Sequence, residues 1–572
     1  MTRPMRVAVR VWPWVLAVVV LAPVLAPGYV LSYDMVFVPD LALRSDFLGL
    51  GSSLPRAVPS DAVVAVVDEV VPGMVLQKLV LVAALVLAGI GARRLVPVEN
   101  GVAQLAATSL YVWNPYVAER LGIGHWPLLL AYAALPWIFD AARRARAGEQ
   151  GALAVLVLWL GLAALSAAGG LMAAAVALVF VWGRDRGALR RTLLVGGAAL
   201  AVNAPWLVAG LLHGSGALTD PTAVEAFAAR GEGVLPVPLT VLGLGGIWNA
   251  EVVPLSRQGW VAVFALAAVV AVCAAGLRRW LRWLPRRDSW GLAALAAVGL
   301  LVGSAGAITP GLMEWFVASV PGGGLLRDGS RYLALVAPLQ AGLFGAGAGV
   351  LAGVMREQVG NVALAAGAVL LPIAVMPDLA WGLAGSLRPV DFPQEYAEAR
   401  EVMVESMAER DEGALLVLPF SSYRAPSWNH GRRTLDPVGR YMPANYVASD
   451  VLYVSGRPIE GEDRRARRVQ DMLSDAEDRM DLARALGGEG IAWVLVDLEA
   501  ERVLGEGVPS LDTASLPQLH AGDLLVVAEL GERVDQNRRD GVVWVAVAWA
   551  LAGVTSITSL AVALRKRPPK VR

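Results

Sequence analysis

The sequence predicts an α-helical polytopic membrane bundle of about twelve transmembrane helices, with a C-terminal extracytoplasmic α/β domain. Three observations predict this class. Of the 572 residues, 56% are hydrophobic and only 17% are charged, a balance that soluble domains rarely reach. Apolar runs of about 20 residues, enough to cross a bilayer, recur along the chain. Between residues 383 and 540 the pattern changes to short apolar strands separated by charged helices.

Each long apolar run is interpreted as a helix, because backbone groups in hydrocarbon must find hydrogen-bond partners within their own segment. The candidate spans cover residues 11–32, 73–92, 97–113, 127–141, 151–167, 169–183, 192–212, 259–277, 289–307, 331–351, 360–382 and 541–563.

The basic residues orient these spans. With a cytoplasmic N-terminus, the inner loops carry arginine clusters at 93–94, 143–146, 184–191 and 278–287, and the tail 565–567 is also basic. Cytoplasmic loops of membrane proteins are enriched in Lys and Arg. The sequence therefore predicts a multi-pass plasma-membrane protein with both termini in the cytoplasm.

Three parts follow from this topology. Residues 1–382 form the bundle, with outward loops at 33–72, 114–126, 213–258 and 308–330. Residues 383–540 form the extracytoplasmic domain, in which runs such as 415–419 and 493–497 are typical of buried strands of an α/β fold. Residues 541–572 add the last span and a basic cytoplasmic tail.

Composition and motifs exclude several classes of function. The net charge is zero, which gives no indication of a nucleic-acid partner. The chain has one cysteine, Cys273, so it forms no intramolecular disulfide. No P-loop, dinucleotide fingerprint or nucleophile elbow occurs in the sequence, which argues against a self-contained ATP-driven pump.

Two carboxylates follow the first span. Asp34 comes just after the predicted end of the helix, and Asp40 lies six residues further along. A carboxylate at the membrane edge can act as general base for a hydroxyl nucleophile, or it can bind a divalent cation. A solvated loop acid is the alternative interpretation. Asp34 and Asp40 are therefore the candidate catalytic residues.

The second outward loop is dense in polar and aromatic side chains. Aromatic faces suit sugar rings, although Trp and Tyr also gather at membrane interfaces. The candidate substrate-binding residues here are Asn114, Tyr116, Glu119, Arg120, His125 and Trp126.

The third and fourth outward loops complete the candidate substrate-binding set. Arg327 and Arg331 place positive charge on the outer side next to three glycines, and arginines at a helix entrance can bind a phosphate or pyrophosphate. Contact with lipid headgroups or with a loop acid is the alternative. The candidates from these loops are Trp248, Asn249, Glu251, Arg327, Asp328 and Arg331. In the domain, the polar run 419–424 directly follows a predicted strand, where α/β domains place functional residues.

The layout resembles the GT-C glycosyltransferases of bacterial cell envelopes. Shared features are the polytopic bundle, the acid after the first span, the long outward loops and the C-terminal extracytoplasmic domain. The resemblance covers mainly residues 10–350. The segments that look like those of actinobacterial membrane proteins, including arabinofuranosyltransferases, are 114–116, 119–121, 124–126, 132–137, 203–206 and 326–332.

This resemblance implies a sugar donor linked to a polyprenyl phosphate, with transfer to an envelope glycan or glycolipid on the outer face of the membrane. It also implies inversion at the anomeric carbon, with Asp34 as the catalytic base and Asp40 as second choice. Many family members carry an adjacent acid pair in this loop, which is missing here. No cofactor is therefore assigned, and a divalent cation stays an open alternative.

Two rival functions remain open. A lipid or polysaccharide transporter would need polar residues paired through the bilayer, but few spans carry charges at mid-depth. A non-catalytic scaffold or glycan-binding protein of envelope assembly would use residues 383–540 for binding and would not need Asp34.

Overall fold

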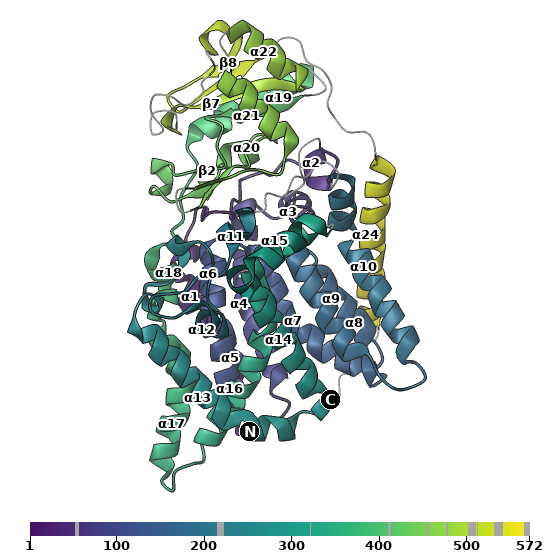
Figure 1. Ribbon diagram of the computed structural model, residues 1–572, viewed down its shortest axis with the longest axis vertical. Helices are drawn as coiled ribbons and strands as arrows, with labels where there is room; N and C mark the ends of the chain where they lie inside the picture. The colour runs from purple at the N-terminus through teal and green to yellow at the C-terminus, as the bar shows by residue number, and fades with distance from the viewer. Residues whose placement is uncertain are drawn as a thin grey trace.

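The computed structural model describes residues 1–51, 57–213, 222–320, 322–409, 413–454, 457–475, 479–500, 511, 513–530 and 541–565. Parts of the predicted loops 33–72, 213–258 and 308–330, parts of 383–540, and the basic tail 566–572 lie outside these residues. A helical bundle carries a smaller sheet-bearing region at one end (Figure 1). We call the described residues between 394 and 530 the sheet region.

Among the described residues, seven helices are long and apolar enough to cross a membrane. They confirm that this is a membrane protein. Their helical segments are α1 (Arg3–Leu21, continued by η1, Ala22–Leu25), α4 (Gly73–Ala92, continued by η2, Arg93–Leu95), α10 (Ala188–His213), α13 (Trp260–Trp283), α14 (Arg286–Ile308), α17 (Gln358–Val375) and α24 (Val542–Arg565).

An eighth span is formed if two bent segments are counted together. These are η6 (Gly329–Leu335) and α16 (Ala337–Leu351), which meet at 41°. Twelve spans are therefore not confirmed.

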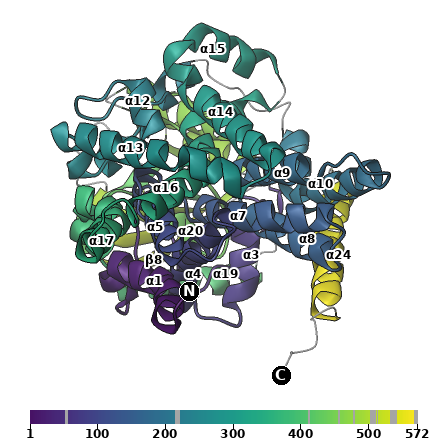
Figure 2. The same cartoon turned by 90° about the horizontal axis from the view of Figure 1, so that it is seen from below.

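Four predicted spans are helices that fall outside this group: α5 (Gly101–Val112), α7 (Trp126–Arg146), α8 (Ala152–Ala163) and α9 (Ala167–Val181). The 12 residues of α5 would extend only about 18 Å, well short of a hydrocarbon core of about 30 Å. Seen from the end of the bundle, α5, α7 and α16 lie inside, whereas α1, α10, α13, α17 and α24 lie at the periphery (Figure 2). Apolar helices in the interior need not span the bilayer.

Several of the predicted cytoplasmic arginines are ion-paired with acids of neighbouring helices. Arg94 contacts Asp140 at 2.5 Å, while Arg143 and Arg146 each approach Asp288 to 2.8 Å. Asp288 is fully buried beneath them. These pairs join α4, α7 and α14 at their arginine-rich ends.

Short elements connect the bundle helices. They are α2 (Ser45–Leu48), α3 (Ser60–Asp68), α6 (Pro115–Gly122), α11 (Thr222–Phe227), α12 (Val237–Leu242), η3 (Ala250–Val252), η4 (Leu255–Arg257), α15 (Pro310–Ser319), η5 (Gly323–Leu326), η7 (Pro377–Leu379) and α18 (Ala380–Gly385).

The sheet region is built on a mixed five-stranded sheet of order β4-β1-β7-β9-β8. Strands β1 (Ala414–Leu418) and β7 (Ile491–Asp497) are parallel, central and buried throughout, as near-continuous apolar strands should be. They confirm the two strands predicted at 415–419 and 493–497. The other strands of this sheet are β4 (Asn445–Val447), β8 (Gln518–Ala521) and β9 (Leu525–Glu529).

Helices and two small hairpins surround this sheet. The helices are α19 (Gln394–Glu409), η8 (Ser427–Asn429), α20 (Pro437–Tyr441), α21 (Arg464–Asp475), α22 (Arg479–Gly488) and η9 (Thr513–Ser515). The hairpins pair β2 (Tyr423–Arg424) with β3 (Thr434–Leu435) and β5 (Leu452–Val454) with β6 (Arg457–Ile459).

Buried arginines fasten the sheet region to the loop that follows α1. Arg440 of α20 binds Asp61 of α3 through two hydrogen bonds of 2.5 and 3.0 Å. Arg44 donates from its Nη1 to the carbonyl oxygens of Gly439, Met442 and Ala444 at 2.8 to 3.2 Å. Because these groups are buried, the contacts hold the sheet region in a fixed position relative to the loop after α1.

Candidate functional site

Asp34 lies at the tip of a tight turn formed by residues 32–35. Ser32 and Met35 exchange backbone hydrogen bonds of 3.2 and 2.9 Å, which closes the turn. Tyr33 has a left-handed backbone (φ 45°), a conformation that is uncommon for a residue with a side chain. The turn leaves the Asp34 side chain 40% exposed while the residues beside it are buried.

The connection between α6 and α7 packs against this turn, backbone to backbone. Ser32 Oγ donates to the carbonyl oxygen of Gly122 at 2.7 Å, and the Asp34 amide donates to that of Ile123 at 3.1 Å. Gly124 has a left-handed backbone (φ 81°), and a Cβ there would lie 2.4 Å from the Met35 nitrogen. Only glycine fits this contact, which brings His125 next to Asp34.

Gly124→Ala is therefore expected to destabilise the protein by about 2 kcal/mol or more, because left-handed strain is joined by a clash with fixed backbone. The measurement is thermal or denaturant unfolding of the detergent-solubilised chain. Gly148→Ala is the matched control, since Gly148 has φ 79° but nothing within 4 Å of its Cβ position. Equal losses in the two variants would contradict the proposed close contact.

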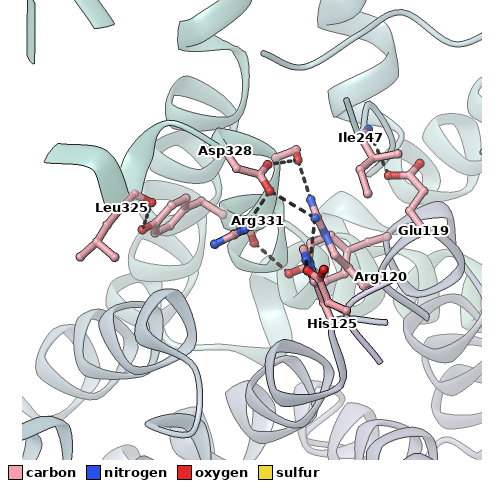
Figure 3. Close-up of polar contacts among 11 residues, drawn as sticks. Glu119, Arg120, His125, Ile247, Leu325, Asp328 and Arg331 are labelled. Atoms are coloured by element: carbon pink, nitrogen blue, oxygen red, sulfur yellow. Dashed lines mark hydrogen bonds and ion pairs between the residues drawn. The ribbon is translucent and has the colours of Figure 1, made fainter. Parts of the chain in front are cut away.

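A chain of polar side chains runs from Asp34 into the bundle. Figure 3 shows its inner part, from His125 and Arg120 to Asp328 and Arg331. His125 Nε2 lies 3.0 Å from Asp34 Oδ2, and His125 Nδ1 lies 3.2 Å from Arg120 Nη1. Arg120 is fully buried and donates to Ser330 Oγ at 2.5 Å.

The chain ends in a buried carboxylate shared by two arginines. Arg331 Nε donates to Asp328 Oδ2 at 2.8 Å, and Arg120 Nη1 approaches the same oxygen to 3.5 Å. Although burial opposes ionisation, Arg120 and Arg331 hold the pKa of Asp328 well below its usual range. Three predicted residues from two distant loops are thus joined in one cluster.

The hydrogen bonds fix the tautomer of His125. A guanidinium can only donate, so Nδ1 of His125 must accept from Arg120 and the proton sits on Nε2, directed at Asp34. Burial lowers the pKa of His125, and the positive charges of Arg331 and Arg120 lower it further. The hydrogen bond and the negative charge of Asp34 raise this pKa, but by less. His125 is therefore neutral at pH 7.

Asp34 is ionised under the same conditions. Partial removal from water raises the pKa of Asp34. The hydrogen bonds to His125 and Tyr423 and the positive charge of Arg331 lower it by more, so this pKa falls below its usual value. The site thus presents a partly exposed carboxylate, hydrogen-bonded to a neutral imidazole, with a half-exposed guanidinium nearby.

Other predicted residues of the second outward loop support this arrangement from within. Asn114 caps α6, accepting from the Val117 amide at 3.0 Å. The Tyr116 hydroxyl donates to the Arg331 carbonyl oxygen at 2.8 Å, and the Trp126 ring packs on Phe37 at 5.5 Å. All three predicted residues are buried.

Glu119 belongs to a second buried cluster. Its Oε2 accepts from the Ile247 amide at 3.2 Å, on one side of the view in Figure 3. Burial, with Glu232 alongside, raises the pKa of Glu119 well above its usual range. Arg257 binds Glu232 at 2.7 Å.

The predicted residues of the third loop lie beside the turn but outside the polar chain. The Trp248 ring meets Phe227 edge to face at 5.0 Å, and Asn249 accepts from the Glu251 amide at 3.0 Å. Glu251 accepts a hydrogen bond from the Tyr33 hydroxyl.

Asp40 and Arg327 both contact the sheet region. Asp40 accepts from Arg400 at 2.6 Å, and Arg327 is ion-paired with Glu462. Asp34 and Asp40 are two acids of one loop, and Arg327 and Arg331 are two arginines of another. The structure places the two members of each pair in different surroundings. One member of each lies in the polar chain and the other in an interdomain ion pair.

Two members of the site are not among the site residues predicted from the sequence. Tyr423 of β2 donates to Asp34 Oδ1 at 2.5 Å, and Ser330 bridges Arg120 and Asp328. Tyr423 belongs to the polar run 419–424 that follows β1, which marked it as a possible functional position. Nothing in the sequence connects it with a residue 389 positions away.

A largely apolar cavity of about 340 Å³ lies among α5, α12, α13, α14, α16 and α17. Asn114 and Pro115, at the start of α6, form part of its wall, together with Arg257 and Gln340. The wall is otherwise mostly aliphatic. Among the described side chains, no three His, Cys, Asp or Glu residues gather closely enough to hold a metal ion.

Comparison with known proteins supports this fold. No family model matches the chain, and no curated protein matches it in sequence. A cryo-electron microscopy structure of a mutant arabinofuranosyltransferase AftD from Mycobacteria superposes with a TM-score of 0.58 at 17% identity. The match covers 93% of this chain but only 42% of that protein. The chain thus shares the fold of a part of that arabinofuranosyltransferase.

Proposed function

We propose that the chain is a membrane-embedded glycosyltransferase that moves a sugar from a polyprenyl-phosphate donor to an envelope glycan or glycolipid. The observation that carries this proposal is the ionised, partly exposed Asp34 held by His125 and lying near Arg331. A base next to a cation, at the junction of a membrane bundle and a sheet region, suits the transfer of a lipid-linked sugar. The shared fold supports the same class.

In this mechanism Asp34 accepts the proton of an acceptor hydroxyl as its oxygen attacks the anomeric carbon. The bond from that carbon to the donor phosphate breaks, with inversion, and polyprenyl phosphate leaves. Arg331 stabilises the charge that develops on the phosphate. Arg120 and Asp328 hold Arg331 and His125 in place.

The bundle suits a donor with a long apolar chain. Its cavity is lined mainly by aliphatic side chains of α13 and α16. Transfer of an isoprenoid chain from water to such a surface lowers the free energy of the system. We assign this cavity to the lipid part of the donor.

The site faces outward in this proposal. The arginines at 93–94, 143–146 and 278–287 lie at the ends of α4, α7, α13 and α14, and the positive-inside rule assigns such ends to the cytoplasm. The N-terminus lies at the end of the bundle farthest from the sheet region (Figure 1). Asp34 and the sheet region would then lie on the extracytoplasmic side of the plasma membrane.

The test is transfer of radiolabel from polyprenyl-phosphate sugars, extracted from bacterial membranes, to envelope glycan fragments by the full chain in proteoliposomes. Arg331→Met should lower kcat by about tenfold to a hundredfold, because a cation that stabilises the leaving phosphate is lost. Arg327→Met is the matched control, since Arg327 is paired with Glu462.

The control variant should keep its transfer rate within about threefold, as expected for a partly exposed ion pair outside the site. Loss of activity in Arg327→Met alone would reverse the assignment of the two arginines. If the wild-type chain transfers no label from any extracted donor, the catalytic proposal fails and a scaffold role gains support.

A further inference from the structure

The Asp34 turn is continuous with a hairpin of the sheet region. Tyr33 donates its amide hydrogen to the Arg433 carbonyl oxygen at 2.9 Å, and its own carbonyl oxygen accepts from the Leu435 amide at 2.8 Å. These bonds form a parallel bridge between Tyr33 and Thr434 of β3. The loop after the first span therefore pairs with β3 at this one bridge, on the hairpin that also carries β2.

Tyr423 lies on this hairpin, directly over Asp34. Its hydroxyl donates to Asp34 Oδ1 at 2.5 Å, while its ring meets that of Tyr33 edge to face at 5.9 Å. The short distance is typical of a charge-assisted hydrogen bond. The ring contact and the hydrogen bond together define where the phenol lies.

Contacts on several sides keep the hairpin in place. Arg440 and Asp61 form a buried pair, Arg44 binds a row of carbonyl oxygens on and after α20, and Arg433 contacts Glu251 at 2.9 Å. Such an arrangement restricts the sheet region to one position relative to the turn. Tyr423 is therefore held at Asp34 by the fold as a whole.

The two oxygens of the carboxylate have different donors. Oδ2 accepts from His125 in the bundle, and Oδ1 accepts from Tyr423 in the sheet region. An ionised carboxylate offers about four lone-pair positions, so an acceptor hydroxyl can still bind at the 40% of the side chain that is exposed. Two fixed donors determine the plane of the carboxylate and hence the direction from which it takes a proton.

We propose that Tyr423 is a positioning residue of the site, and that the sheet region completes the site by holding the Asp34 carboxylate for proton transfer. This inference rests on the proposed role of Asp34. It gives residues 413–454 a part in the reaction itself, in addition to any contact with a glycan.

The first test measures the Asp34 contact without any sugar transfer. A carbodiimide reacts with the protonated carboxyl group, so the extent of labelling at Asp34, followed by peptide mass spectrometry against pH, reports its titration. Tyr423→Phe keeps the ring but removes the hydroxyl, so the labelling midpoint should rise by about one pH unit as a donor to the carboxylate is lost. Tyr453→Phe is the matched control, because Tyr453 is 73% exposed on β5.

The second test measures transfer by the same variants. Tyr423→Phe should lower kcat about tenfold with little change in the KM for the donor, and the acid limb of its pH–rate profile should move up with the labelling midpoint. Tyr453→Phe should leave both unchanged.

The outcomes distinguish failure of the Tyr423 inference from failure of the proposed glycosyltransferase function. A labelling midpoint that does not move in Tyr423→Phe overturns the inference, whether or not the chain is active. An unchanged rate and pH profile in an active Tyr423→Phe variant also overturns it. If the wild-type chain shows no transfer, the proposed function fails, and the midpoint alone then decides whether Tyr423 holds Asp34.

Discussion

Asp34→Asn is expected to lower the rate of sugar transfer by about 1000-fold, within the range of rate losses seen when a general base is removed. The amide cannot accept the proton of an acceptor hydroxyl, yet it has nearly the same shape as the carboxylate. Its oxygen can still accept from His125 or Tyr423, so the turn should keep its structure. The measurement is the initial rate of label transfer in proteoliposomes, together with the unfolding temperature.

Asp40→Asn provides the control for this prediction. Asp40 is the other acid of the same loop, but it is 62% exposed and paired with Arg400 of the sheet region. The rate should stay within about threefold of wild type, because exposed ion pairs contribute little. A large loss in Asp40→Asn with normal activity in Asp34→Asn would transfer the role of base to Asp40.

Asp61→Asn is expected to destabilise the chain by about 3–5 kcal/mol. Asp61 and Arg440 are both buried, and removing one member of a buried pair leaves the other charge without compensation. The measurement is the free energy of unfolding in detergent, or the unfolding temperature where unfolding is irreversible. Because the pair joins α3 to α20, transfer should fall in parallel with the loss of docking.

Two further variants decide whether the effect comes from the buried charge. Glu460→Gln removes one member of an exposed pair with Arg467 and should cost less than about 1 kcal/mol. Replacing both Asp61 and Arg440 by Leu and Met should recover much of the stability that Asp61→Asn loses. A double variant as unstable as the single one would show that shape, and not charge, sets the cost.

The sequence predicted the elements whose signals are local. Strands β1 and β7 were predicted from their apolar runs, and helices form at all the predicted spans. The number of spans could not be derived in this way. The hydropathy of the sequence indicates that α5, α8 and α9 are apolar. An apolar helix can be covered by lipid or by other helices, and only the packing of the bundle distinguishes these two cases.

The same limit applies to the candidate site. Arg120 and His125 lie five residues apart across one tight turn, and Asp328 and Arg331 three apart, so each pair lies within one loop predicted from the sequence. The contact of these pairs with Asp34 depends on backbone packing at Gly124, which spacing along the chain does not encode. The arginine at 327 resembles that at 331 in sequence, but its partner Glu462 lies 135 residues away.

By itself, the sequence determined that this is a membrane protein with an acid after its first span, arginines in the loops between spans and a C-terminal region that carries a sheet. These features follow from composition and from spacing along one segment. Only the tertiary structure decided which acid and which arginine share a site, and that Tyr423 reaches Asp34. Hydrogen bonds and ion pairs between distant segments form only where the fold removes water from between them, and residue order along the chain carries no record of that distance.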